Sequence, residues 1–199
     1  MKLYSTKNST FSRRVRIALH EKEVDLEEID TPKEARSTPE YRALNPYGRI
    51  PTLVDGDLVV YESTAILGYL EERVPTPALL PDDPGERARA LMHVKLCDLE
   101  FSSHAIRIQW PKRVQVASTL DEAASLAATR SIESHYGHLE RELTGKSYLV
   151  AERFTMADLV YVPFLHFHEL LGLSLPPAVA SWWAKLSERP SVLATVPDF

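Results

Sequence analysis

Hydrophobic positions along this chain of 199 residues change their spacing about one third of the way in. The first part carries short apolar runs of the kind that form β-strands, separated by stretches with the 3.6-residue spacing of helices. The runs that predict strands are residues 2–5, 26–30, 52–54 and 58–61. Predicted helices cover 11–22, a short piece before Asn45 and a segment from Ser63 onward. In the first of these, Arg13, Arg14 and Arg16 are the polar positions between apolar residues of an amphipathic helix. The predicted order is therefore β-α-β, a short helix, then β-β-α, and its first crossover is expected to be right-handed.

Residues 74–85 contain four prolines and cannot form a helix interior, so they are interpreted as a linker. Beyond it the strand signals disappear, and helical spacing covers 86–109, 121–143, 155–171 and 177–188, with Pro111 ending or kinking the first of these. We therefore predict an α/β domain at 1–75, a linker at 76–85 and an all-helical domain at 86–199. Thr155 followed by Asp158 is typical of a helix N-cap, which favours a structural role for Asp158.

The segment 45–69 concentrates several signals in a short space. A turn signal with Asn45 and Gly48 precedes Ile50-Pro51, and Asp55-Gly56-Asp57 separates the two β-type runs as in a hairpin. Glu62 and Ser63 follow at once, where a helix N-cap and first turn belong. On residues alone, Pro51 could be an ordinary strand-entry proline and Glu62-Ser63 an ordinary helix start.

This order of N-P-x-G-basic-Ile-P-x-L, hairpin and Glu-Ser pair resembles the glutathione-binding half of the glutathione S-transferase family. The resemblance covers almost the whole chain. It implies a thioredoxin-like N-terminal domain, an all-helical C-terminal domain and a homodimer. It also implies that glutathione is the co-substrate, with a small electrophile as its partner in the reaction.

The resemblance assigns glutathione-binding roles to the residues of this segment. Pro51 is expected to follow a cis peptide bond, and the backbone of Ile50 to pair with the cysteinyl backbone of glutathione, as an added strand would. Ser63 and its N–H would bind the γ-glutamyl carboxylate, and Glu62 would pair with the ammonium group. For the glycyl carboxylate the candidates are Arg49, Lys33 and Arg36.

The loop 6–13 is where members of this family that use serine keep the catalytic hydroxyl, and the match places it at Ser9. Its task would be to lower the thiol pKa of glutathione, because the thiolate is the nucleophile. The alternatives are that Ser9 only caps the first helix, a role for which Ser12 competes more convincingly, or that Thr10 or Asn8 contacts the thiol. The loop has no cysteine, unlike the cysteine-type members, and Thr10 stands where a proline is familiar.

The helix after the linker carries aromatic and basic groups at helical spacing. Strips of this kind are most often core or dimer contacts. In the family the corresponding helix lines the co-substrate pocket, so its candidate wall residues are Phe101, His104, Ile108 and Trp110. Arg107 could attract an anionic group of the substrate.

Composition narrows the class of protein further. A net charge of -5 argues against non-specific nucleic-acid binding, and there is no apolar run long enough to span a bilayer. The one cysteine, Cys97, excludes an intramolecular disulfide. No metal site is predicted, because His166 and His168 do not share a helix face. We expect a cytoplasmic protein without membrane or nucleic-acid partners.

Two functions fit these observations. The first is a detoxification-type transferase that forms the glutathione thiolate and adds it to an apolar or aromatic electrophile, with isomerase, dehalogenase or etherase chemistry as variants that the sequence does not separate. The second is a non-catalytic binding or regulatory protein with the same fold. Thr10 in place of a proline leaves the second open, whereas the Glu62-Ser63 pair favours the first.

Overall fold

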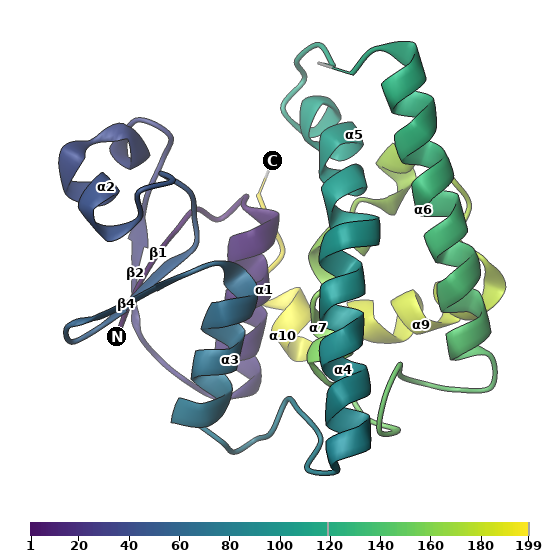
Figure 1. The fold of residues 1–199 in the computed structure, drawn as a ribbon, viewed down its shortest axis with the longest axis horizontal. Helices are drawn as coiled ribbons and strands as arrows, with labels where there is room; N and C mark the ends of the chain where they lie inside the picture. The colour runs from purple at the N-terminus through teal and green to yellow at the C-terminus, as the bar shows by residue number, and fades with distance from the viewer. Residues whose placement is uncertain (119, 199) are drawn as a thin grey trace. The chain divides into compact units, whose positions relative to one another are not determined.

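The computed structural model describes residues 1–118 and 120–198, which form two compact units (Figure 1). The first contains Met1–Leu79 and the C-terminal segment that begins at Pro190, and the second contains Leu80–Arg189. The chain passes between the units within the proline-rich segment that was interpreted as a linker. The return of the last residues to the first unit is not visible in the sequence pattern, which assigned them to the helical domain.

The first unit is built on a four-stranded sheet in the order β2-β1-β3-β4. Its strands are β1 (Lys2–Ser5), β2 (Glu27–Asp30), β3 (Thr52–Asp55) and β4 (Leu58–Tyr61). β1 runs parallel to β2 and antiparallel to β3, and β3 and β4 form the predicted hairpin around Gly56, whose φ is +59°. A positive φ suits glycine, which explains the Asp-Gly signal.

Two helices of this unit pack side by side, α1 (Thr10–Glu21) and α3 (Ser63–Arg73) (Figure 1). The other helical segments between β2 and β3 are η1 (Ala35–Ser37) and α2 (Pro39–Leu44). Apolar side chains from the sheet and the two longer helices are buried together: Leu3, Val15, Ile17, Leu53, Ile66, Leu67 and Leu70. The predicted strand and helix order of this half is confirmed.

The arginines of α1 depart from the amphipathic pattern. Arg13 and Arg14 were read as polar positions between apolar ones, yet only 1% and 0% of their surfaces are exposed. Arg13 is buried because the C-terminal segment covers it: its guanidinium donates to the carbonyl of Val192 in α10 (Pro190–Leu193) at 3.0 Å and to the Thr195 hydroxyl at 3.4 Å. A local sequence pattern cannot reveal burial by residues some 180 positions away.

The second unit is helical, as predicted. Its long helices are α4 (Pro84–Leu96), α5 (Ser103–Arg113) and α6 (Glu122–Leu143), and a π-helical stretch, η2 (Cys97–Ser102), joins α4 to α5. Three short helices follow, α7 (Met156–Leu159), α8 (Val162–Leu165) and η3 (His168–Leu171), and after them α9 (Pro177–Ser187), which is as long as α5. Pro111 lies inside α5, which ends two residues later.

The segment 155–171 was predicted as one helix, and it is three short ones. Pro163, in the first turn of α8, cannot donate the backbone hydrogen bond that would continue α7. The predicted cap at its start is confirmed: Thr155 and Asp158 form a reciprocal capping box. Asp158 also accepts hydrogen bonds from Trp182 Nε1 at 2.9 Å and Leu149 N at 3.0 Å, so its role is structural.

Within the described residues, none of the helices combines the length and apolar character needed to cross a bilayer.

Candidate functional site

A small hollow of about 90 Å³ in the first unit brings together most of the predicted glutathione-binding residues. The loop between α2 and β3, the start of α3 and the first turn of α1 contribute to it. Its lining is Phe11, Asn45, Arg49, Ile50, Pro51, Glu62 and Ser63. Five of these seven were selected from the sequence; Phe11 and Asn45 were not given binding roles.

The backbone on both sides of Ile50 is held by buried side chains. The carbonyl of Arg49 accepts from the Tyr41 hydroxyl at 2.6 Å and from Asn45 Nδ2 at 2.9 Å. The Thr52 hydroxyl contacts the same two groups, at 3.0 and 3.1 Å. Burial is the main cause that raises the pKa of Tyr41, which keeps its phenol protonated and able to donate. These contacts fix the chain at the point where an extended peptide would pair with it.

The Ile50–Pro51 peptide bond is cis, as the family resemblance implied. Pro51 is buried, and Ile50 is half-buried beside the hollow. Arg49 is exposed, with its guanidinium carbon 6.0 Å from the centre of the Tyr47 ring. Lys33 is exposed too, and Arg36 is half-buried in η1. The hollow is lined by Arg49 and by neither of the other two candidate cations.

The N-terminus of α3 has the features of an anion site. Ser63 is its first residue and is buried, and Glu62 stands at the N-cap with a φ of +71° and an exposed side chain. The Glu62 side chain makes no capping hydrogen bond, so first-turn N–H groups receive no cap from it. Arg14 Nη1 lies 3.4 Å from the Ser63 hydroxyl. A helix N-terminus and a buried guanidinium thus meet at one serine, which suits a carboxylate.

Arg14 is a third residue of this site that the sequence did not reveal, besides Phe11 and Asn45. Its position in an arginine-rich helix made it look like part of a polar face. Its guanidinium carbon also lies 5.3 Å from the centre of the Phe11 ring. Only the packing of α1 against α3 brings Arg14 to Ser63, 49 residues away.

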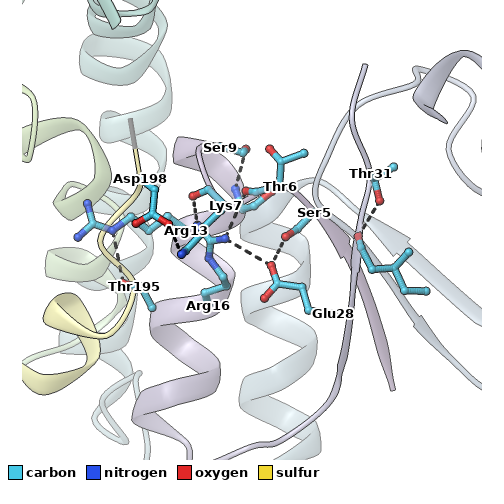
Figure 2. A network of polar contacts seen from close by, with 12 residues as sticks. Ser5, Thr6, Lys7, Ser9, Arg13, Arg16, Glu28, Thr31, Thr195 and Asp198 are labelled. Carbon is cyan, nitrogen blue, oxygen red and sulfur yellow. Dashed lines mark hydrogen bonds and ion pairs between the residues drawn. The ribbon is translucent and has the colours of Figure 1, made fainter. Parts of the chain in front are cut away.

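Ser9 ends the loop between β1 and α1 and caps the helix. Its hydroxyl oxygen accepts a hydrogen bond from Ser12 N at 3.1 Å, and its backbone N–H donates to the carbonyl of Thr6 at 3.1 Å (Figure 2). The expectation that Ser12 would be the better cap is wrong, because α1 begins at Thr10. Thr10 and Ser12 are buried, whereas Ser9 and Asn8 are half-buried. Ser9 does not line the hollow and lies two residues before Phe11, which does.

Capping and thiol activation make different demands on a hydroxyl. A serine oxygen can accept hydrogen bonds and donate one. The cap uses an acceptor position of Ser9, so the O–H remains the group that could donate to a sulfur atom. The two readings of Ser9 are therefore compatible.

The four candidate co-substrate residues lie in the second unit in different environments. Phe101 is fully buried among the rings of His135, Tyr136, Tyr161 and Phe164, with centroid distances of 5.6 to 6.3 Å. Ile108 is buried and borders a hollow of about 190 Å³. His104 is half-buried and Trp110 is 45% exposed. The Phe101 ring is thus part of the core of this unit. That the four residues line a co-substrate pocket stays a prediction.

No group of three or more histidine, cysteine, aspartate or glutamate side chains that could hold a metal ion occurs in residues 1–118 and 120–198. Cys97 is buried in the helical unit, and its sulfur lies 3.5 Å from the carbonyl of Val160. A small buried thiol of this kind is a packing residue.

Sequence profiles of two domains match this chain. Glutathione S-transferase, N-terminal domain, matches residues 3–78, and Glutathione S-transferase, C-terminal domain, matches residues 99–190. The chain belongs to the glutathione S-transferase family. The expected thioredoxin-like domain followed by an all-helical domain is thereby confirmed.

Relatives of this glutathione S-transferase family member carry different names. It is 34% identical over its whole length to a Stringent starvation protein A homolog of Coxiella burnetii, of which it covers 92%. It is 30% identical, again over its whole length, to Glutathione S-transferase Z2 of Arabidopsis thaliana, of which it covers 91%. The chain also aligns with a solved structure of a sphingomonad glutathione S-transferase complexed with glutathione, at a TM-score of 0.83 and 26% sequence identity. The alignment covers 98% of this chain and 96% of the sphingomonad chain.

Proposed function

We propose that this protein is a glutathione transferase that binds glutathione in the hollow of its first unit and transfers the thiolate to an electrophilic carbon of an apolar or aromatic molecule. In the reaction the thiol loses its proton and the sulfur forms a bond to that carbon. In a substitution a leaving group departs with the electron pair of its bond to the carbon, and in an addition the π-electron pair of a double bond moves away from the carbon and takes up a proton. The electrophile would be bound by the helical unit, with His104, Ile108 and Trp110 as the candidate residues, whereas the fully buried Phe101 would support them from the core. Isomerase, dehalogenase and etherase reactions are variants of the same thiolate chemistry.

The glutathione anchor rests on complementary charges at the start of α3. The γ-glutamyl end of glutathione carries a carboxylate and an ammonium group. Ser63, its N–H and the Arg14 guanidinium suit the carboxylate, and the exposed Glu62 suits the ammonium. The cysteinyl backbone would pair with Ile50, and Arg49, which lines the same hollow, would bind the glycyl carboxylate. A hollow of about 90 Å³ would hold one end of the tripeptide, with the rest extended along the edge beside Ile50.

One observation supports Ser9 as the thiol-activating group: its oxygen accepts from Ser12 N, which leaves its O–H to donate. A hydrogen bond to sulfur stabilises the thiolate, and the N-terminus of α1 adds positive potential. Lowering a thiol pKa by one unit needs about 1.4 kcal/mol, and a hydrogen bond to a charged group contributes about 1.5 to 3 kcal/mol. One hydroxyl is therefore sufficient.

A binding or regulatory role without catalysis is the second candidate. The Coxiella burnetii relative, 34% identical, has a name that does not describe a transferase. In such a protein the anchor at Glu62 and Ser63 could persist while the thiol stays protonated. The state of the bound thiol thus separates the two functions.

The decisive measurement is the ultraviolet absorbance of the glutathione thiolate in complex with the protein as a function of pH. We expect a thiol pKa well below that of free glutathione in the wild type, and a value near that of free glutathione in Ser9→Ala. Ser9→Thr serves as the matched variant, because threonine both caps a helix and donates a hydrogen bond. It should keep the lowered pKa.

Two other outcomes of this titration would contradict the assignment. Tight binding with an unshifted thiol in the wild type supports the binding protein and removes the transferase. A lowered pKa that survives Ser9→Ala moves the activating role to another loop group, such as Asn8 or Thr10.

Family membership also supports the proposals that the protein is cytoplasmic and a homodimer. The helical unit exposes Leu91, Met92 and Leu99 by 46% to 53%, apolar area that a subunit contact would bury.

A further inference from the structure

We propose that Arg16 is the positioning residue of the Ser9 loop: it holds the main chain of Thr6 and Lys7 so that the Ser9 hydroxyl is presented to the glutathione sulfur. This inference rests on the proposed role of Ser9 and adds to it a residue that touches neither glutathione nor the anchor. Sequence reasoning had treated Arg16 only as a polar position of α1.

The guanidinium of Arg16 donates to two successive carbonyls of the loop. Nη2 lies 2.5 Å from the carbonyl oxygen of Lys7, and Nη1 lies 3.3 Å from that of Thr6 (Figure 2). The Thr6 carbonyl also accepts the backbone N–H of Ser9, at 3.1 Å. Arg16 and Ser9 therefore share one acceptor. A shift of the Thr6 carbonyl would move the backbone of Ser9 with it.

Arg16 is itself fixed from the sheet. Glu28 of β2 lies 3.4 Å from Arg16 Nη1 and also accepts a hydrogen bond from the Ser5 hydroxyl at the end of β1. Only 11% of the Arg16 side chain is exposed, against 41% for Glu28. Burial lowers the pKa of Arg16, and the Glu28 carboxylate opposes that shift, so the guanidinium stays charged. The loop is thus tied through Arg16 to two neighbouring strands.

The shape of the guanidinium matters here. Its planar fork reaches two carbonyls and a carboxylate at once, which the single ammonium of lysine cannot do with the same geometry. The loop borders a cavity of about 450 Å³ through Ser5, Thr6, Lys7 and Arg16, and residues 194–196 line the same cavity. On that side the loop is held by polar contacts, from Arg16 and from the ion pair of Lys7 with Asp198. Hydrogen bonds from Arg16 supply the restraint that a packed neighbour would otherwise give.

The test compares Arg16→Met with the wild type in the thiolate titration, in glutathione affinity by calorimetry and in the pH profile of kcat/KM with 1-chloro-2,4-dinitrobenzene. We expect the bound thiol pKa of Arg16→Met to rise toward that of free glutathione. The value of kcat/KM should fall by about tenfold near pH 6.5 and recover near pH 9, where the free thiol ionises unaided. Glutathione affinity should stay within about twofold of the wild type, because the anchor is unchanged.

Arg13→Met is the matched control, since it removes a buried arginine of the same helix that contacts Val192 and Thr195. It should keep the lowered thiol pKa. Arg16→Lys should give a thiol pKa between those of the wild type and Arg16→Met. If Arg16→Met does not fold, the thiol pKa of Arg16→Lys in the same titration tests the role of Arg16.

A lowered thiol pKa that is unchanged in the Arg16 variants, or shifted equally by Arg13→Met, overturns the role of Arg16 alone. A wild type whose bound thiol is not shifted overturns the activating role of Ser9 as well. The two failures are therefore distinguishable.

Discussion

Single residues at this site serve two purposes at once. Ser9 caps α1 with its oxygen and keeps its proton for donation. Ser63 begins α3 and contacts the Arg14 guanidinium. Glu62 stands at an N-cap without capping, which leaves its carboxylate for a ligand. In the proposed function, anchoring and activation fall on different side chains and can be separated by substitution.

Glu62→Ala should weaken glutathione binding far more than Ser9→Ala does. Loss of the carboxylate leaves the ligand ammonium unpaired, and a hydrogen bond between charged groups contributes about 1.5 to 3 kcal/mol, or about tenfold to a hundredfold in affinity. Asp57→Ala is the control, because Asp57 is exposed on the hairpin. Calorimetry that found equal losses for Glu62→Ala and Ser9→Ala would refute this division of roles.

His135 should make the helical unit sensitive to acid. Burial, followed by the charges of His138 and His93, lowers the pKa of His135 to about 4, and its Nε2 lies 2.9 Å from the Tyr161 hydroxyl. In the unfolded chain His135 takes up a proton near pH 6.5, whereas in the folded chain it takes up that proton only near pH 4. Its stabilising contribution is therefore present above pH 6.5 and is lost between pH 6.5 and 4, by on the order of 3 kcal/mol.

Urea unfolding between pH 7.5 and 4.5 would measure this loss. His135→Gln, which cannot take up the proton, should reduce the dependence on pH and leave the part that comes from buried His93, whose pKa is also lowered to about 4 by burial. His20→Gln, at an exposed position, is the control and should leave the dependence unchanged. The same slope in the wild type and in His135→Gln would show that His135 is not the source.

At the scale of elements, α1 contacts several other parts of the first unit. One end of it presents Ser9, its middle contributes Arg14 to the start of α3, and its Arg13 binds the C-terminal segment. Just beyond its other end, Lys22 is buried against Glu71 of α3, with Nζ 2.7 Å from the carboxylate. Lys22 also donates to the carbonyls of Val74 and Pro77, which fixes the start of the proline-rich segment.

Lys22→Met should destabilise the protein by about 3 to 5 kcal/mol, because it leaves the Glu71 carboxylate buried without its cation. Thermal or urea unfolding monitored by circular dichroism would measure the change. Lys2→Met is the control: Lys2 forms an exposed pair with Glu27 at 3.3 Å, worth less than about 1 kcal/mol. If the free energy of unfolding falls by the same small amount in both variants, the buried pair does not hold α1 to α3.

At the scale of the whole molecule, the expected assembly is a homodimer. Sedimentation velocity at micromolar concentration should show a species of about twice the 22.5 kDa chain mass. Leu99→Glu should shift the equilibrium toward monomer, because Leu99 is 53% exposed and a charge buried in a subunit contact is costly. Leu193→Glu, at a 60% exposed position of the first unit, is the comparison. A wild type that sediments only as monomer would contradict the expectation.

The sequence by itself determined the order of the strands and helices in the first unit and the helical character of the second, and it selected five of the seven residues that line the hollow. These features depend on short-range rules: the strand period, the Asp-Gly turn, proline as a helix breaker and the position of Glu62 and Ser63 at a helix start. The capping box at Thr155 was predictable for the same reason.

Only the tertiary structure decided which side chains meet across long separations. Arg14 reaches Ser63, Arg13 is covered by residues near the C-terminus, and Arg16 joins the Ser9 loop to Glu28 of β2. Hydrophobic periodicity places an arginine on a polar face, because it does not record which distant segment will bury it. The sequence could not decide the role of Phe101 either, because an aromatic residue at helical spacing suits a pocket wall and a core equally. In the structure its ring packs in the core.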